Sequence, residues 1–555
     1  MTLICVPIPV TDPDLAARDA LEAKQQGADL IEFRIDEFFS GDHDTHAAEN
    51  QARQLAALIS QSPLSCIVTC RTAAEGGHYD GPEDARIALF EHLTRANAKG
   101  HHPPRYIDVE HASYTRSANL RQKINLALSI QGGVGQPNPD APTSLILSLH
   151  DTRARPADLL RRLADMYATP AASVVKVAYT ARSLRDSLEL LDLPEHAPKP
   201  TIALAMGEFG LLSRILAPKF RGFLTFAPLR PASATAPGQP TLDDLLNLYR
   251  IRSITPDTRV YGVIGYPVAH SLSPLVHNAG FAASNTNAVY LPLPTAPGPD
   301  PAATDLSLKA TLLELIHHPR LHLRGVSVTF PFKESLVRLA AQEAWGIDPD
   351  ALAMGAANTL TISEHGAVSL SNTDAPATQS CLESALGTLA GRHIAILGAG
   401  GVSSAAAHAA ARAGARISIY ARQPDQAEAL AARVHAHVPT AQAAAANWQA
   451  VPSIAADAIV NGTPVGMTGG PAPGESPIPD LSRLGPETVV MDTVYSPVET
   501  PLLKAARAAG LATIDGVSLF TRQAAAQFER WTGSPPEPGL FERLVRERLR
   551  TQEEP

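Results

Sequence analysis

Short apolar runs and longer amphipathic segments alternate along the first half of the chain. The runs are rich in β-branched residues, as buried strands are, and the segments between them have a helical period. The runs occupy residues 3–10, 28–38, 65–71, 105–110, 144–151, 173–179, 201–206 and 222–229. Eight strands that alternate with helices predict a (β/α)₈ barrel.

The alternation continues after a short break. Residues 241–254 predict a final amphipathic helix, and the helix-breaking stretch 253–258 separates it from a strand at 260–265. Two further strands begin at Gly325 and Arg392, and the second of them runs into a glycine turn and an alanine-rich helix. The second half is therefore also α/β, and the break predicts a domain boundary.

Composition excludes several classes of protein. The 555 residues exceed the size of one core, and a net charge of −9 with a pI near 6.1 provides no basic surface for nucleic acid. No apolar run is long enough to span a membrane, and no charged segment followed by an apolar core begins the chain. We expect no targeting peptide and a cytoplasmic location.

Cysteine use agrees with that location. The chain has four cysteines, which are too few for a disulfide framework at this length: Cys5, Cys66, Cys70 and Cys381. Cys66 and Cys70 share one face of a strand and are spaced like core residues, not like zinc ligands. We therefore expect neither disulfides nor a metal site.

One lysine interrupts an apolar strand. Lys176 lies in the middle of the run at 173–179, and lysine is rarely buried unless its charge is compensated. Burial would favour the uncharged amine, which attacks ketones to form a Schiff base. The alternative is an edge strand that places the tip of the lysine in water.

Polar side chains gather where several barrel strands end. Glu32, Arg34 and Asp36 alternate along the second strand, so they are expected to share one face. Arg71, Glu75 and His150 follow at the ends of the third and fifth strands. Each has a structural alternative, such as an ion pair between Glu32 and Arg34. Together they would suit a substrate that carries a carboxylate and a reactive ketone.

The first 245 residues or so resemble type I 3-dehydroquinate dehydratase. The motifs that carry the resemblance lie at 32–36, 69–77, 148–151, 175–177, 213–214 and 236–239. The resemblance implies that Lys176 forms an imine with the substrate, that His150 moves protons, and that Glu75 orients His150. It implies substrate contacts from Glu32, Arg34, Arg71, Arg214, Thr235 and Gln239. The family usually has serine at Thr235, so we expect a modest effect on the lid.

The second half has its own polar positions. Ser271 and Ser273 precede a helix, which they could cap, or they could present two hydroxyls to a small anion. Lys333 begins a helix, where its charge opposes the helix dipole, and such a violation indicates function. Asn358 and Asp374 lie at the ends of predicted loops and complete this set of polar positions.

The glycine turn predicts a nucleotide site. Residues 398–401 link a strand to a helix, and glycines there let the backbone approach a pyrophosphate at the helix N-terminus. The spacing departs from the usual fingerprint because Ser403 stands at its last glycine. The next strand ends at Arg422 with no acidic residue, which favours the 2′-phosphate of NADP over NAD; Arg422 could also be only solvated.

These residues resemble shikimate dehydrogenase over about 258–555. This resemblance implies an α/β substrate-binding domain at 258–376 that the helices of 517–555 complete, and a Rossmann NADP-binding domain at 377–516; the resemblance to the dehydratase implies a barrel at 1–252. Lys333 and Asp374 would flank the reacting oxygen. The implied substrate contacts are Ser271, Ser273, Thr329, Asn358, Tyr495 and Gln523. The implied cofactor contacts are Gly398, Ala399, Gly400, Gly401, Val402, Arg422, Thr463, Val494 and Gly516.

Two departures accompany this resemblance. The family often has Asn-Arg-Thr where this chain has Ala421-Arg422-Gln423, which weakens the preference for NADP without reversing it. A glycine-containing turn usually follows the catalytic aspartate, whereas residues 375–377 here are Ala-Pro-Ala. The helix after Asp374 should therefore begin at a changed angle.

The leading hypothesis is a bifunctional enzyme of the shikimate pathway. It would dehydrate 3-dehydroquinate to 3-dehydroshikimate and then reduce that ketone to shikimate with NADPH. One alternative is a quinate/shikimate dehydrogenase that prefers NAD in the second half, and another is a non-enzymatic regulator that senses quinate-pathway ligands. The chain is expected to bind neither nucleic acid nor membrane, and both a monomer and a homodimer are compatible with the sequence.

Overall fold

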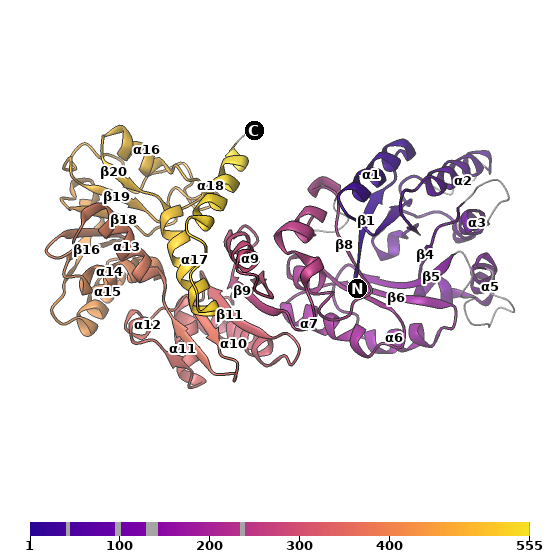
Figure 1. Ribbon diagram of the computed structural model, residues 1–555, viewed down its shortest axis with the longest axis horizontal. Coiled ribbons are helices and arrows are strands. Elements are labelled where there is room, and N and C mark those ends of the chain that lie inside the picture. The colour runs from indigo at the N-terminus through magenta and orange to yellow at the C-terminus, as the bar shows by residue number, and fades with distance from the viewer. Residues whose placement is uncertain (40–44, 95–101, 129–142, 234–238, 554–555) are drawn as a thin grey trace. The chain divides into compact units, whose positions relative to one another are not determined.

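The computed structural model describes residues 1–39, 45–94, 102–128, 143–233 and 239–553 (Figure 1). The chain divides into two units, Met1–Thr258 and Arg259–Pro555, which we call unit 1 and unit 2. No helix among the described residues combines the length and the apolar character that a bilayer crossing requires. All four cysteines are buried and free.

Unit 1 is a nearly closed barrel of parallel strands. Its eight strands follow the order β7-β6-β5-β4-β3-β2-β1-β8, so β1 pairs with both β2 and β8. The strands are β1 Leu3–Pro9, β2 Leu30–Arg34, β3 Cys66–Thr69, β4 Tyr106–Glu110, β5 Ser144–Asp151, β6 Ala172–Thr180, β7 Thr201–Met206 and β8 Leu224–Phe226. This topology confirms the predicted (β/α)₈ fold.

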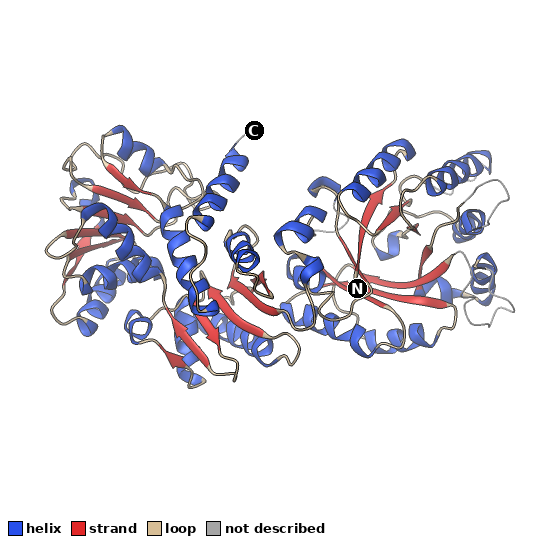
Figure 2. Cartoon of the chain, in the orientation of Figure 1, coloured by secondary structure: helices blue, strands red, loops and turns tan. Residues whose placement is uncertain are grey.

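Helices surround these strands (Figure 2). They are α1 Pro13–Gln25, α2 Thr45–Ser60, α3 Glu83–Thr94, α4 His111–Arg116, α5 Ala118–Ala127, α6 Leu159–Ala168, α7 Leu184–Asp192 and α8 Leu211–Ile215. The amphipathic pattern explains their placement: α6, for example, buries Leu159, Leu163 and Met166. That spacing puts one apolar stripe toward the strands.

The period of the strands sets the interior of the barrel. Leu30, Ile146 and Val174 belong to a buried apolar cluster inside it. Side chains two positions further along a strand point the same way, so Glu32, Ser148 and Lys176 form the next layer. The alternation that predicts the strands thus also places one polar layer above an apolar floor.

Two local expectations were wrong. The single helix at 241–254 is instead a π-helical segment, Asp244–Leu248, and a short 3₁₀ helix, Ile251–Ser253. Arg250 lies between them with φ 49°, a left-handed conformation that ends the helix. The second strand, expected over 28–38, is shorter and ends at Arg34, so Asp36 lies beyond it.

The first sheet of unit 2 is mixed. Its order is β10-β9-β11-β13-β14-β12; β9, β10 and β11 are parallel, and β13 runs antiparallel to β11 and β14. The strands are β9 Arg259–Gly265, β10 Ala288–Pro294, β11 Leu323–Val328, β12 Gly346–Ile347, β13 Thr359–Ile362 and β14 Val368–Ser371. The helices are α9 Ser273–Ala283, α10 Pro301–His317, α11 Lys333–Gln342 and α12 Pro349–Met354.

The second sheet of unit 2 is parallel throughout, in the order β17-β16-β15-β18-β19-β20. Its strands are β15 His393–Leu397, β16 Arg416–Ala421, β17 Gln442–Asn447, β18 Ala458–Asn461, β19 Val489–Asp492 and β20 Ala512–Ile514. The helices that accompany them are α13 Asp374–Leu386, α14 Gly401–Arg412, α15 Pro424–His437 and α16 Pro501–Ala508. This order is typical of a Rossmann-type domain.

The last two helices, α17 Gly516–Thr532 and α18 Leu540–Glu553, return to the first sheet. They pack an aromatic core against β9 and α9, in which Trp531 and Phe528 contact Tyr261 and Phe281. The indole N–H of Trp531 also donates to the carbonyl oxygen of Leu360 at 3.1 Å. Aromatic burial of this kind fixes the C-terminal helices against the first sheet of unit 2.

Candidate active sites

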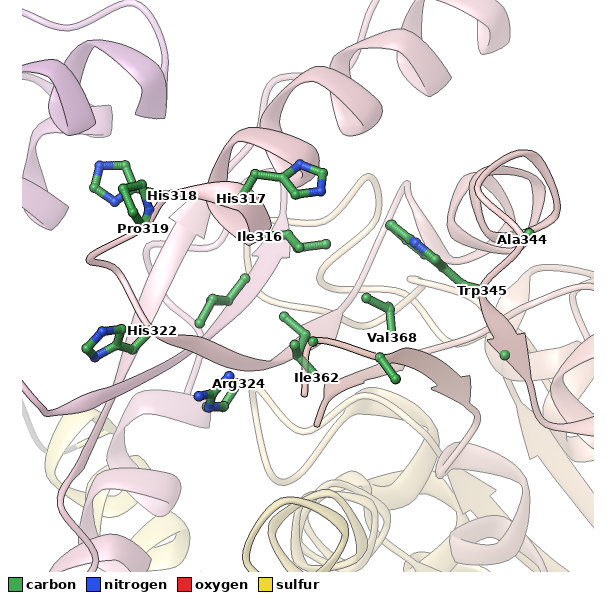
Figure 3. A pocket seen from close by; sticks show the side chains of 14 residues that line it. Ile316, His317, His318, Pro319, His322, Arg324, Ala344, Trp345, Ile362 and Val368 are labelled. Atoms are coloured by element: carbon green, nitrogen blue, oxygen red, sulfur yellow. The ribbon is translucent and has the colours of Figure 1, made fainter. Parts of the chain in front are cut away.

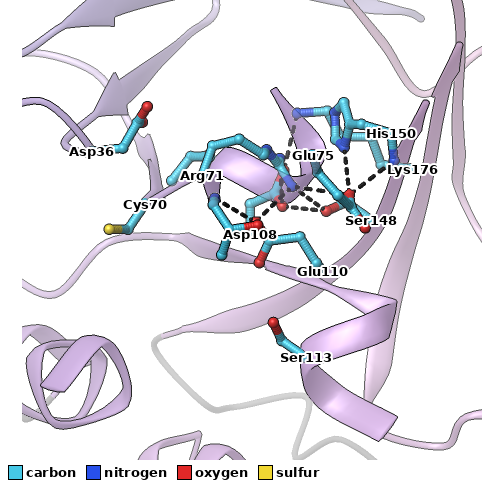
Figure 4. Close-up of polar contacts among 12 residues, drawn as sticks. Asp36, Cys70, Arg71, Glu75, Asp108, Glu110, Ser113, Ser148, His150 and Lys176 are labelled. Atoms are coloured by element: carbon cyan, nitrogen blue, oxygen red, sulfur yellow. Dashed lines mark hydrogen bonds and ion pairs between the residues drawn. The ribbon is translucent and has the colours of Figure 1, made fainter. Parts of the chain in front are cut away.

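Lys176 lies inside the barrel, where it is 6% exposed (Figure 4). Its Nζ donates to Asp108 Oδ2 at 2.9 Å and to Glu32 Oε1 at 3.2 Å, and it lies 4.5 Å from the ring centroid of Phe226. The sequence predicted a lysine inside a buried strand rather than at an edge, and the structure places Lys176 there, beside two carboxylates. These carboxylates compensate an ammonium, and Glu32 is also an acceptor for the proton that the amine must lose.

Asp108 is held by three neighbours. Its Oδ1 accepts from Arg71 Nη2 at 2.9 Å and from Ser148 Oγ at 2.5 Å, which leaves Oδ2 for Lys176. Burial opposes its ionisation, but Arg71 and Lys176 hold the pKa of this carboxyl well below its usual range. The sequence analysis missed Asp108, although it alternates with Glu110 along one strand as Glu32 does with Arg34.

His150 and Glu75 form a second pair in the same mouth. The backbone N–H of His150 donates to Glu75 Oε2 at 2.9 Å, and Nδ1 lies 3.3 Å from the same oxygen. Burial and the nearby cations Arg71 and Lys176 hold the pKa of His150 well below its usual value, whereas burial raises the pKa of Glu75 to about 7. A neutral imidazole whose Nδ1 faces a carboxylate leaves Nε2 as the proton acceptor.

The structure describes three of the four remaining residues expected in the first site. Arg214 is buried, and its Nη1 has no hydrogen-bond partner in the described part of the chain; burial lowers its pKa to about 10. An unpaired buried guanidinium suits a carboxylate ligand. Arg34 pairs with Asp36 instead, at 2.9 Å from Nε to Oδ1. Gln239 is half-buried, and Thr235 lies outside the described residues.

Two helix starts bring together the central pair of the second site. Lys333 is the first residue of α11 and Asp374 the first of α13, and Nζ donates to Oδ2 at 2.6 Å. Their side chains are only 15% and 8% exposed. The N-terminus of α13 favours the charge of Asp374, which in turn stabilises an ammonium at the start of α11.

Asn358 is fixed beside this pair. Its Oδ1 accepts from the backbone N–H of Thr373 at 2.9 Å, and its Nδ2 donates to Thr373 Oγ1 at 3.0 Å. Thr373 Oγ1 also lies 3.4 Å from Gln523 Oε1, so the structure brings Asn358 and Gln523 to one residue. Gln527, which the sequence analysis missed, donates to the carbonyl oxygen of Asn358 at 3.1 Å.

The other expected substrate contacts lie on neighbouring segments. Ser273 begins α9, and its backbone N–H lies 3.3 Å from Ser271 Oγ, so this hydroxyl accepts from the first turn of the helix. Thr329 directly follows β11 and is half-buried. Tyr495 is also half-buried, with its ring centroid 5.1 Å from that of Phe520.

The glycine turn between β15 and α14 fits a dinucleotide. Gly398 has φ +99°, which favours glycine, and a Cβ at Gly400 would meet nothing within 4 Å. The backbone is therefore open to a phosphate at the N-terminus of α14. A Cβ at Gly401 would lie 3.1 Å from Lys333 Cδ, which places this turn beside the second catalytic pair.

The remaining cofactor residues surround that turn. Ala399 and Val402 pack against the core of the second sheet. The hydroxyl and the backbone N–H of Thr463 both donate to Asn461 Oδ1, and Val494 N–H donates to Asp492 Oδ1 at 3.1 Å. Gly516 approaches the carbonyl of Val494 so closely that its Cβ would lie 2.2 Å from that oxygen.

Arg422 follows the end of β16 and is exposed. Its guanidinium is therefore accessible to a ligand from solvent. An exposed cation at the end of the second Rossmann strand can bind the 2′-phosphate of NADP.

A cavity of about 600 Å³ lies elsewhere in unit 2 (Figure 3). His317, Arg324, Trp345 and Val368 contribute to its lining, at the end where β11 begins. Thr329 follows the opposite end of that strand. This cavity contains none of the residues expected in the two sites.

The fold and the two sites together define an α/β enzyme that joins a lysine-containing barrel to a two-lobed dehydrogenase. Family models agree: residues 4–256 match type I 3-dehydroquinase, 263–360 match the shikimate dehydrogenase substrate binding domain, and 367–495 match the alanine dehydrogenase/PNT C-terminal domain. The chain belongs to the family of bifunctional 3-dehydroquinate dehydratase/shikimate dehydrogenases. This confirms the resemblance expected from its motifs.

A sequence relative of the same two-activity type supports that assignment, and further similar proteins match single parts of the chain. A chloroplastic bifunctional 3-dehydroquinate dehydratase/shikimate dehydrogenase of Arabidopsis thaliana is 32% identical over 565 residues, covering 98% of this chain and 84% of that protein. A shikimate dehydrogenase (NADP(+)) of Anaeromyxobacter sp. (strain K) is 39% identical over 52% of this chain and 97% of its own. The solved shikimate 5-dehydrogenase of Thermus thermophilus, in complex with NADP(H) and shikimate, is 32% identical, with a TM-score of 0.43 over 52% of this chain and 99% of its own.

Proposed function

We propose that this chain catalyses two consecutive reactions. Unit 1 dehydrates 3-dehydroquinate to 3-dehydroshikimate, and unit 2 reduces 3-dehydroshikimate to shikimate with NADPH. The observation that carries the proposal is the presence of two complete sets of reacting groups in one chain. Lys176 lies between two carboxylates near His150 and Glu75, and Lys333 pairs with Asp374 beside a nucleotide-binding turn.

The first reaction begins at Lys176. Its Nζ loses a proton, for which Glu32 Oε1 at 3.2 Å is an acceptor, and attacks the substrate ketone; loss of water then gives an iminium ion. His150 then removes a proton from the carbon next to the iminium carbon and protonates the departing hydroxyl, which leaves as water. Hydrolysis of the iminium releases 3-dehydroshikimate and restores the amine. Proton transfer by a positioned group contributes roughly 10²–10⁴-fold to such rates.

Two charged groups prepare this site for its substrate. Arg214 offers a guanidinium to the substrate carboxylate, because its Nη1 is buried and unpaired in the described chain. Glu75 faces Nδ1 of His150 and so keeps Nε2 available as the base. Arg71 holds Asp108 in turn, at 2.9 Å.

The second reaction needs a proton donor beside the ketone. NADPH supplies a hydride when it is bound. Lys333 supplies the proton to the carbonyl oxygen as the alcohol forms, and Asp374 keeps the ammonium aimed at that oxygen. Asn358, Gln523 and the hydroxyls of Ser271 and Ser273 would bind the substrate's own hydroxyls and carboxylate.

The cofactor of unit 2 is NADP. Its shikimate dehydrogenase relatives are named as NADP(+) enzymes. The exposed Arg422 supports the same choice over NAD, because a cation favours the 2′-phosphate. Comparing kcat/KM for NADPH and NADH, and for shikimate and quinate, separates this activity from a quinate dehydrogenase that prefers NAD.

A coupled assay tests both activities. The chain is given 3-dehydroquinate and NADPH, and the fall in cofactor absorbance is followed. Lys176→Ala should abolish this signal and leave shikimate oxidation by NADP unchanged. Borohydride added with 3-dehydroquinate should fix an adduct on wild type and on the control Lys199→Ala, but not on Lys176→Ala. A Lys176→Ala variant that keeps the coupled signal would refute the imine mechanism.

We further propose the domain boundaries 1–252, 258–376 with 517–555, and 377–516. The division of contacts at Thr258 and the spans of the three family models support them. Limited proteolysis with mass mapping should cleave first near residues 253–258. Early cleavage inside the barrel would contradict the boundary.

The buried free thiols support a reducing compartment, which we propose is the cytoplasm. The Arabidopsis relative is named as chloroplastic, so cell fractionation is the deciding measurement. Whether the active form is a monomer or a homodimer is tested by light scattering at assay concentrations.

A further inference from the structure

Among the described residues, Arg86 has the largest fully buried side chain. It lies in the first turn of α3, and all five of its guanidinium N–H groups have an acceptor. Nε donates to Glu83 Oε2 at 3.2 Å, and Nη2 donates to Glu83 Oε1 at 2.6 Å and Ser113 Oγ at 2.9 Å. Nη1 donates to the carbonyl oxygen of Cys70 at 2.7 Å and to Glu110 Oε2 at 2.5 Å.

Two of these acceptors adjoin the barrel site. Cys70 immediately precedes Arg71, and Figure 4 shows Arg71 among Glu75, Asp108 and Glu110. The second oxygen of Glu110, Oε1, accepts from the backbone N–H of Thr72 at 2.9 Å and lies 3.4 Å from Arg71 Nη1. Arg86 therefore holds the chain on both sides of Arg71 without contacting the reacting groups.

The contact between Arg86 and Glu110 matters because of the charges around Arg71. Arg71 is shared by three carboxylates, at 2.9 Å from Asp108, 3.4 Å from Glu110 and 3.8 Å from Glu75. Arg86 supplies Glu110 with a counterion of its own. Without it, Glu110 would draw Arg71 away from Asp108 and Glu75, since an uncompensated buried carboxylate is costly.

We propose that Arg86 is a positioning residue for the dehydratase site, which it serves by fixing Glu110 and the Cys70 carbonyl so that Arg71 and the loop to Glu75 stay in place. The inference rests on the dehydratase function proposed for unit 1. Arg86 touches neither Lys176 nor His150, so its effect reaches them only through Arg71, Glu75 and Asp108.

The pH profile of dehydration distinguishes this role from a merely structural one. Four groups surround the Glu75 carboxyl. Arg71 follows the end of β3, Glu110 and Asp108 come from β4, and His150 comes from β5. Arg71 lowers the pKa of Glu75, and Glu110 raises it. Loss of the Arg86 contacts would leave the charge of Glu110 less compensated, and this should raise the pKa of Glu75 further. The acidic limb of the kcat/KM profile, which reports that ionisation, should therefore move to higher pH.

The test compares Arg86→Lys with the control Arg155→Gln. Lysine keeps the charge, but its three N–H groups replace five. Arg155 forms a similar two-point pair with Glu189, at 2.6 Å, outside the site. Arg86→Lys should lower dehydratase kcat/KM about tenfold and move the acidic limb of its pH profile to higher pH. Arg155→Gln should leave kcat/KM and the pH profile unchanged. Shikimate oxidation, measured on the same samples, normalises for the amount of active unit 2, and far-ultraviolet circular dichroism reports whether unit 1 is folded.

Two results would overturn the inference. One is an Arg86→Lys chain with wild-type kcat/KM and pH profile; the other is a lower melting temperature with an unchanged profile. Ser113→Ala removes a single acceptor and provides a milder variant should Arg86→Lys fail to fold, with a smaller loss of kcat/KM and a limb displaced in the same direction. A wild-type chain that lacks dehydratase activity would refute the proposed function itself.

Discussion

Glu75 is expected to cost stability in exchange for catalysis. Its side chain is only 10% exposed, and burial raises its pKa from 4.5 to about 7, in spite of Arg71 at 3.8 Å. The difference corresponds to about 3 kcal/mol. The folded chain binds this proton more tightly than the unfolded chain does. The stabilisation from protonated Glu75 is therefore complete below pH 4.5 and is lost as the pH rises through about 7.

Glu75→Gln removes the ionisation and keeps the shape. At pH 8 the variant should raise the free energy of unfolding of unit 1 by up to about 3 kcal/mol, and at pH 5 by about 1 kcal/mol or less. Dehydratase kcat should nevertheless fall by about 10²-fold, because an amide holds the imidazole less well than a carboxylate does. The acidic limb of the wild-type pH profile, expected near pH 7, should disappear.

The assay can separate the two units within the intact chain. All three tryptophans, Trp345, Trp448 and Trp531, belong to unit 2, so tryptophan fluorescence follows that unit alone. Far-ultraviolet circular dichroism follows both units, and the transition seen only there belongs to unit 1. Equal stability of Glu75→Gln and wild type at pH 8, or an unchanged acidic limb, would refute the reasoning.

Three further outcomes concern unit 2. Asp374→Asn should lower dehydrogenase kcat about 10²-fold with little change in KM for NADPH, because it weakens the 2.6 Å pair with Lys333; an unchanged kcat would contradict this. Arg422→Ala should raise KM for NADPH roughly 10-fold and leave that for NADH unchanged, and equal effects on both would refute the phosphate contact. Gly516→Ala should abolish dehydrogenase activity and spare dehydration, because its Cβ would lie 2.2 Å from the carbonyl oxygen of Val494; full activity would show that the backbone adapts.

Local sequence patterns were sufficient for the architecture. Strand runs with a period of two, separated by helical segments, predict the barrel, and the glycine turn at 398–401 predicts the nucleotide lobe. The period of the hydrophobic residues and the residue types at turns depend on only a few neighbouring positions. They can therefore be read from a single sequence. They failed at 241–254, where the left-handed Arg250 and a π-helical turn replace one regular helix.

Pairings across strands could not be obtained in that way. The sequence placed Lys176 on a buried strand, but only the closed barrel brings Asp108 and Glu32, which are 68 and 144 residues away along the chain, to its amine. Those carboxylates are the charge-compensating partners that a buried lysine requires, and the strand pattern alone could not name them. Asp108 could have been suspected from its alternation with Glu110, yet alternation alone does not say which face is inward.

The sequence by itself determined which elements form and which residue types could carry chemistry, because propensity and periodicity are local. The tertiary structure decided which charges share one small volume, and hence the low pKa of Asp108, the raised pKa of Glu75 and the role of Arg86. Electrostatic interactions depend on distance and burial, and both are fixed only when distant strands and helices close around the same site.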